Sequence, residues 1–103
     1  MSQRLDTLKS LVSQNPADTR VGYMLGMELM NTGDLEGAAE QFRRLADANP
    51  DFAPAYFHGG QTLERLGRIE EARQMYRKGI DVTTRSGDSH TRDELEAALD
   101  LLG

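Results

Sequence analysis

Few residues of this 103-residue chain have side chains suited to catalysis or metal binding. The chain has no Cys, which excludes disulfides, thiolate metal sites and a Cys nucleophile. Its two His residues, His58 and His90, lie too far apart in the sequence to resemble a metal-binding pair. The hydroxyl and carboxyl groups of Ser86-Gly87-Asp88-Ser89 are accompanied by no candidate base or oxyanion site. We therefore expect a protein that is not an enzyme and that holds no metal or cofactor.

Charged side chains form the remaining candidate sites. A basic run could bind a phosphate or an acidic partner, but interleaved Glu64, Glu70 and Glu71 favour ordinary ion pairs on a helix surface; the run comprises Arg65, Arg68, Arg73, Arg77 and Lys78. The acidic group Asp93, Glu94 and Glu96 is explained by the stabilising effect of negative charge near a helix N-terminus. The formal net charge of −5 disfavours nonspecific nucleic-acid binding, which depends on neutralising phosphates.

Length and hydropathy indicate the class of protein. At 103 residues, the chain has the size of one domain. Its N-terminal segment is charged through the middle and lacks the apolar run of a signal peptide. No stretch approaches the ~18 apolar residues of a membrane span. We expect a soluble, cytoplasmic protein, and Met1 together with the character of the final helix favours a complete chain.

A 34-residue internal repeat organises the sequence. The segment GDLEGAAEQF at 33–42 returns as GRIEEARQMY at 67–76, and Asn15-Pro16 returns as Asn49-Pro50. The same shift matches further apolar and small residues: Gly26 with Gly60, Leu29 with Leu63, Ala38 with Ala72, and Phe42 with Tyr76. Such agreement at positions where packing restricts the choice of residue indicates a repeated structural unit.

Each unit has the pattern of two helices. Apolar spacing from Arg20 predicts a helix that Gly33 ends, and Asp34 is placed to cap a second helix that ends before Pro50. The second unit repeats this order, with Pro54 in a first turn and Gly67 between the helices.

Two further helices flank the repeated units, so the chain is expected to be all-α with about six helices. Residues 2–13 carry Leu5, Leu8, Leu11 and Val12 on one face. Near the other end, Thr91-x-x-Glu94 predicts a capping box, followed by Leu95, Ala98, Leu99 and Leu102 at helical spacing.

This pattern resembles the tetratricopeptide repeat (TPR) family over residues 19–84. With Thr19 and Ala53 as first positions, the small eighth residue is Gly26 and Gly60. The Ala at the twentieth position and the aromatic residue at the twenty-fourth are Ala38 and Phe42, then Ala72 and Tyr76. The departures are Gly22 at the fourth position, Gly59 at the seventh, Leu45 and Gly79 at the twenty-seventh, and Thr84 where the first unit has Pro50.

The resemblance implies a right-handed superhelical stack of antiparallel helix pairs forming a single domain over residues 1–103. Residues 1–18 would form a half repeat with Arg4 in place of Ala, and residues 19–52 the first repeat. Residues 53–86 would form the second repeat and residues 87–103 a capping helix.

The resemblance also implies a protein-interaction module whose first helices line a concave groove for a peptide or helix of a partner. The projected groove residues are Arg20, Tyr23, Met24, Met27, Met30, Asn31, Phe57, His58, Gln61, Glu64 and Arg65. In one interpretation Tyr23 and Phe57 anchor an apolar segment above an adaptable Met-rich floor. In the other, several of the Met residues fill core space beneath the N-terminal helix. The repeat period leaves both open.

Three hypotheses for function follow. The first is a non-catalytic adaptor that binds another protein through the groove, without contacting nucleic acid or membrane. The second is an assembly subunit that self-associates through its terminal helices, with Leu95, Leu99 and Leu102 packed on another chain. Across these hypotheses we expect the protein to be a monomer or a weak homodimer. The third, a nucleic-acid-binding helical repeat, is disfavoured by the acidic balance.

Overall fold

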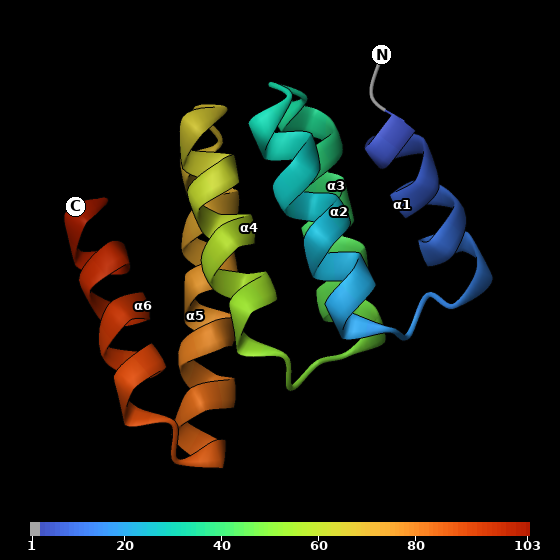
Figure 1. The fold of residues 1–103 in the computed structure, drawn as a ribbon. Coiled ribbons are helices and arrows are strands. Elements are labelled where there is room, and N and C mark those ends of the chain that lie inside the picture. The colour runs from blue at the N-terminus through green and yellow to red at the C-terminus, as the bar shows by residue number, and fades with distance from the viewer. Residues whose placement is uncertain (1–2) are drawn as a thin grey trace.

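The computed structural model describes residues 3–103, which form six α-helices (Figure 1). They are α1 (Gln3–Gln14), α2 (Thr19–Asn31), α3 (Leu35–Ala48), α4 (Ala53–Arg65), α5 (Ile69–Ser86) and α6 (Ser89–Leu101). Each helix packs antiparallel on the next one in the chain, and α2 also contacts α4. The predicted all-α stack of about six helices is confirmed. Of the helix predicted over residues 2–13, residue 2 lies outside the described residues.

The turns between paired helices form as the repeated phrase predicts. Gly33 and Gly67 adopt φ values of 88° and 78°, the left-handed region in which Gly meets no steric penalty. Asp34 then caps α3, since its Oδ1 accepts a hydrogen bond from the backbone N–H of Gly37 at 2.8 Å. Pro54 lies in the first turn of α4, where its missing N–H costs nothing.

The start of α6 corrects the sequence prediction. Asp88, not Thr91, is the N-cap, and its Oδ1 accepts a hydrogen bond from the backbone N–H of Thr91 at 3.1 Å. The predicted capping box of Thr91 and Glu94 is therefore wrong. The physical reason is the left-handed Gly87, which places Asp88 before the helix as Gly33 places Asp34.

The exit from the second repeat differs from that of the first. α3 has 14 residues and ends before Pro50, because the residue preceding Pro avoids helical geometry. Thr84 stands at the matching position of α5, which continues to Ser86 and reaches 18 residues. As a result α6 begins 36 residues after the start of α4, although α4 begins 34 residues after the start of α2.

The helix pairs are drawn together where glycine on one helix meets an aromatic ring on the other. A Cβ added to Gly26 would lie 2.5 Å from a ring carbon of Phe42, and one added to Gly60 would lie closer still to the ring of Tyr76. Phe42 and Tyr76 are completely buried. The repeated glycine and the repeated aromatic residue therefore form one interlocking contact in each pair.

Where the two repeats differ in sequence, a large residue on one helix of the pair faces a glycine on the other. In the first repeat a Cβ on Gly22 would lie 2.7 Å from Leu45, whose side chain occupies that space. In the second repeat the large residue is Tyr56 on the first helix, and Gly79 faces it on the second. Gly79 also leaves room for Leu95 of α6, which is completely buried. The exchange of large and small residues keeps both pairs close-packed.

Replacing Gly60 by Ala tests the interlocking contact. The added methyl group would collide with the Tyr76 ring, and we expect the free energy of unfolding to fall by about 1–2 kcal/mol, even though Ala favours a helix by ~1 kcal/mol over Gly. Urea denaturation followed by circular dichroism measures the change. The matched control is Gln74→Ala on the exposed side of α5, which we expect to be nearly neutral. Equal or higher stability of Gly60→Ala would contradict the contact.

Candidate protein-binding face

The structure places the projected groove residues on two adjacent helices, α2 and α4, which lie in front of α3 and α5 in Figure 1. We call these eleven projected residues, six on α2 and five on α4, the α2/α4 face. Arg20, Asn31 and Arg65 are exposed. The other members are half-buried: Tyr23, Met24, Met27, Met30, Phe57, His58, Gln61 and Glu64. The fold therefore brings together five large apolar side chains and six polar ones on two adjacent helices.

An aromatic cluster joins the two helices beneath this face. The Tyr23 ring lies 5.3 Å from that of His58, 6.2 Å from that of Phe52 and 6.5 Å from that of Phe42, measured between centroids. The Tyr23 hydroxyl is 3.1 Å from Nε2 of His58. Phe57 makes an edge contact with His58 at 5.3 Å. Tyr23 is thus tied into the packing between the repeats, whereas Phe57 lies at the margin of the cluster.

His58 is held neutral inside this cluster. Burial lowers the pKa of His58 below 6.5, and the negative charge of Glu94 on α6 opposes that effect only in part. Its Nδ1 atom is buried and, among residues 3–103, has no hydrogen-bond partner. A proton added to this ring would place a charge against the faces and edges of Tyr23, Phe42 and Phe57.

The methionines of α2 are partly in the core and partly at the surface. Met24, Met27 and Met30 pack against the core, and each keeps part of its side chain exposed. Each side chain is therefore packed against the core on one side and accessible to solvent on the other. Flexible, polarisable side chains in that position form a surface that adapts to apolar groups.

Glu64 has a structural partner. Its carboxylate accepts a hydrogen bond from the hydroxyl of Tyr76, and burial together with this bond raises the pKa of Tyr76 well above its usual value. The projected groove residue Glu64 therefore also fixes the ring that interlocks with Gly60.

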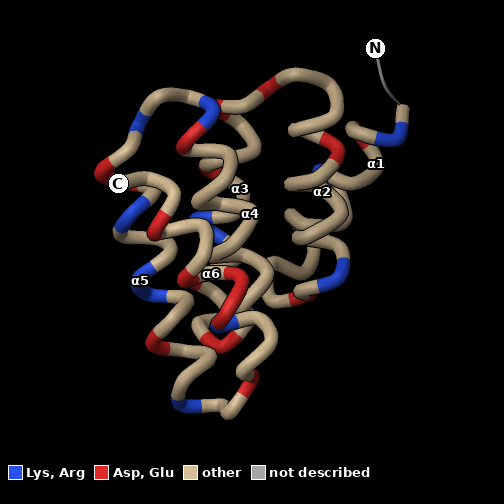
Figure 2. Tube along the Cα trace, turned by 90° about the vertical axis from the view of Figure 1, so that its left-hand side faces the viewer, with Lys and Arg blue, Asp and Glu red and all other residues tan. Residues whose placement is uncertain are grey.

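Ion pairs account for part of the basic run, as the sequence predicts. Arg68 contacts Glu71 at 2.5 Å and Glu36 at 3.1 Å, and Arg73 lies 3.7 Å from Glu70. Figure 2 shows basic and acidic residues interspersed along the helices. These pairs are the helix-surface ion pairs that the sequence predicts, and Arg65, Arg77 and Lys78 of the same run are exposed.

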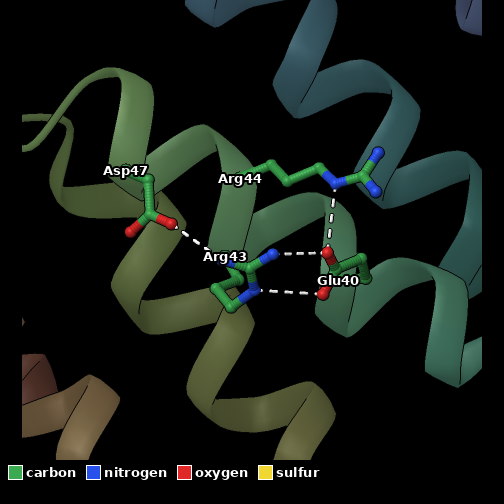
Figure 3. A network of polar contacts seen from close by, with 4 residues as sticks. All are labelled: Glu40, Arg43, Arg44 and Asp47. Atoms are coloured by element: carbon green, nitrogen blue, oxygen red, sulfur yellow. Dashed lines mark hydrogen bonds and ion pairs between the residues drawn. The ribbon is translucent and has the colours of Figure 1, made fainter.

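A second ionic network lies on α3 (Figure 3). Glu40 accepts hydrogen bonds from Arg43 at 2.5 Å and Arg44 at 3.0 Å, and Arg43 also reaches Asp47 at 2.8 Å. The hydrogen bond from Arg43 lowers the pKa of Glu40. Arg43, Arg44 and Asp47 are exposed and Glu40 is half-buried, so the network adds little to stability.

The sequence did not indicate a cavity that the structure shows on the other side of α2. It has a volume of about 590 Å³ and lies between α1, α2 and α3. Its floor includes Leu25, Leu29 and Leu45, and its rim includes Lys9 and Arg44. No projected groove residue lines it. The cavity depends on how α1 sits against α2, which local sequence patterns do not determine.

Residues 3–103 hold neither a metal-binding cluster nor a membrane-spanning helix. Within that range no group of three or more His, Asp or Glu residues is arranged to hold a metal ion. None of the helices described there is both long enough and apolar enough to cross a membrane.

Comparison with known proteins decides the family. The model of the tetratricopeptide repeat matches residues 23–88, which is more than half of the chain. The chain belongs to the tetratricopeptide repeat family. The match begins at Tyr23 within α2 and ends at Asp88, the N-cap of α6, so it covers most of α2 and all of α3, α4 and α5.

This TPR protein is similar in sequence to other proteins and in fold to solved structures. An uncharacterised protein of Methanocaldococcus jannaschii is 40% identical over 60 residues, covering 58% of this chain and 70% of its own. A TPR domain protein of Salinibacter ruber, solved by NMR, has a TM-score of 0.80 and 30% identity, covering 85% of this chain and 89% of its own. Protein BPP2914 of Bordetella parapertussis has a TM-score of 0.79 at 24% identity, covering 99% and 89%.

The pH dependence of stability tests the state of His58. Because its pKa is lowered in the folded state, the unfolded chain binds the proton more readily. The stability that neutral His58 provides is therefore present above 6.5 and is lost as the pH falls from there through the lower pKa of the folded state. We expect the free energy of unfolding to decline as the pH falls below 6.5, and this decline to shrink in His58→Phe.

Urea titrations at each pH measure the effect. The control, His90→Gln, removes the exposed histidine and is expected to keep the decline. An identical decline in wild type and His58→Phe would show that His58 is not the group responsible.

Proposed function

We propose that this TPR protein binds an apolar or amphipathic segment of a partner protein across the α2/α4 face, without catalysis. TPR domains are generally protein–protein interaction modules. We place this activity in the cytoplasm, and the net charge of −5 favours a protein partner over nucleic acid.

One observation carries the proposal. Five large apolar side chains on two adjacent helices pack against the core on one side and remain partly exposed on the other: Tyr23, Met24, Met27, Met30 and Phe57. A partner that covered them would bury apolar area without requiring any core residue to move. Arg20, Gln61 and Arg65 supply hydrogen-bond donors beside this apolar surface.

The assembly hypothesis requires three leucines of the last helix to pack on another chain, but they pack within this one. Leu95, one of the three leucines predicted to pack on another chain, is completely buried against α5, where Gly79 makes room for it. Leu99 and Leu102 are half-buried and pack against the same core. Leu95, Leu99 and Leu102 therefore attach α6 to the second repeat, whereas Leu101 is exposed.

Phe57→Ala tests the binding face. Phe57 is the better probe because Tyr23 holds the repeats together through three rings and a hydroxyl contact, so that Tyr23→Ala would also weaken the fold. We expect Phe57→Ala to remain folded and to weaken partner binding about tenfold or more, as expected for an aromatic anchor. Partners are captured from the native lysate and identified by mass spectrometry, and their affinity for each purified variant is measured by calorimetry.

The cavity between α1 and α3 provides the rival surface for the same experiment. Ser13→Trp places a large side chain at its exposed rim and leaves α2 and α4 unchanged. We expect this variant to retain the partners of the wild type. Loss of binding in Ser13→Trp, with binding retained in folded Phe57→Ala, would overturn the proposal.

A further inference from the structure

The cavity between α1, α2 and α3 has a counterpart inside the stack, because α3, α4 and α5 follow in the same order one repeat period later. Leu29 in the floor of the cavity corresponds to Leu63, which lines a groove between α3 and α5 that we call the internal groove. The cavity has a volume of about 590 Å³ and the internal groove one of about 180 Å³. Of the two, only the cavity reaches the size of ordinary small-molecule sites, ~300–1,000 Å³.

An arginine bridges the internal groove, and in the cavity its position holds an aspartate. Arg68 on α5 reaches Glu36 on α3 at 3.1 Å and also contacts Glu71 at 2.5 Å. One period before Arg68 and Glu71 stand Asp34 and Gly37. Asp34 accepts a hydrogen bond from the backbone N–H of Gly37 at 2.8 Å, and Gly37 has no side chain. The cavity is therefore open where the internal groove is bridged.

Two cationic side chains that line the cavity keep unused hydrogen-bond donors. Lys9 is exposed and makes no ion pair with any residue from 3 to 103. Its counterpart one period later, Arg43, is held by two carboxylates on α3. Arg44 contacts Glu40 through Nε at 3.0 Å, and its two terminal nitrogens have no hydrogen-bond partner within the same range. Figure 3 shows these nitrogens on the side of the guanidinium away from Glu40.

The acidic groups of the lining are already engaged. Asp34 caps α3, and Glu40 accepts hydrogen bonds from Arg43 and Arg44. Lys9 and Arg44 are therefore the charged groups with donors available to a ligand. Because the carboxylates of Asp34 and Glu40 lie in the same lining, they would repel a multiply charged anion such as a phosphate more strongly than a carboxylate.

We propose that this cavity binds a small amphipathic carboxylate. The apolar part of the ligand lies on the floor formed by Leu25, Leu29 and Leu45, and its carboxylate is bound by Lys9 and Arg44. Burial of the apolar part supplies affinity, and the charge-assisted hydrogen bonds supply the preference for an anion. No residue of the α2/α4 face lines the cavity, so this site is independent of the proposed protein-binding function.

Decanoate serves as the probe, with decanol and decyltrimethylammonium as the neutral and the cationic probe of the same chain length. We expect decanoate, kept below its micelle concentration, to shift the amide NMR signals of Ser13 and Gly37, which line the cavity, more than those of the α2/α4 face. Decanoate should bind about tenfold or more tightly than decanol, because two cations contact its carboxylate, and decyltrimethylammonium should bind no better than decanol.

Variants separate the site from general stickiness. Lys9→Gln should weaken decanoate binding about fivefold, as expected for one partly exposed ion pair. Ser13→Trp, which places an indole ring at the rim, should abolish it. The matched control is Arg77→Gln, which removes one positive charge from an exposed position on α5 outside the cavity. This control and Phe57→Ala should bind decanoate as the wild type does.

Several results would overturn the proposal. They are an absence of decanoate binding, equal binding of decanol or of the cationic probe, and larger shifts on the α2/α4 face than at the cavity. Wild-type affinity in folded Lys9→Gln or Ser13→Trp would overturn it as well, and so would weakened binding in Arg77→Gln or Phe57→Ala.

Discussion

The structure depends on one contact, made once in each repeat, in which a glycine of the first helix receives an aromatic ring of the second. At Gly26 and Gly60 no Cβ atom can be accommodated, and the rings of Phe42 and Tyr76 fill the space completely. Because interiors are close-packed, this contact fixes both the separation of the paired helices and their register. The turn glycines and the cap at Asp34 serve to bring the pair to that contact.

Close packing on one side of α2 and α4 determines what remains on the other. Gly22 with Leu45 and Tyr56 with Gly79 divide the same volume in opposite ways, so the repeats differ in sequence without losing density. The room at Gly79 also docks α6 through Leu95. Tyr23 and His58 join the repeats, and the methionines of α2 stay partly exposed above this junction. A rigid scaffold with an adaptable apolar surface suits partner binding better than catalysis.

The sequence predicted what the repeat period controls. Gly33, Asp34 and Gly67 have strong local preferences, so the turns and helix pairs followed from them. The start of α6 was mispredicted because a capping-box pattern at Thr91 competed with Asp88, and only the left-handed Gly87 decides between them. The projected binding residues do lie on adjacent helices, but the role of Tyr23 in the aromatic cluster and the cavity beside α1 depend on contacts between distant segments. A period cannot specify those contacts.

The most direct test of this account transplants the second repeat's volume exchange into the first. Gly22→Tyr alone should collide with Leu45, and Leu45→Gly alone should leave a cavity, so each should be strongly destabilised. In the double variant the introduced tyrosine on α2 would fill the space vacated on α3, as Tyr56 fills the space beside Gly79. Its hydroxyl would extend toward the turn before α2, as that of Tyr56 donates to the Pro50 carbonyl at 2.7 Å. A double-mutant cycle by urea denaturation should then show a loss of stability well below the sum of the two single losses. Additive losses would contradict the account.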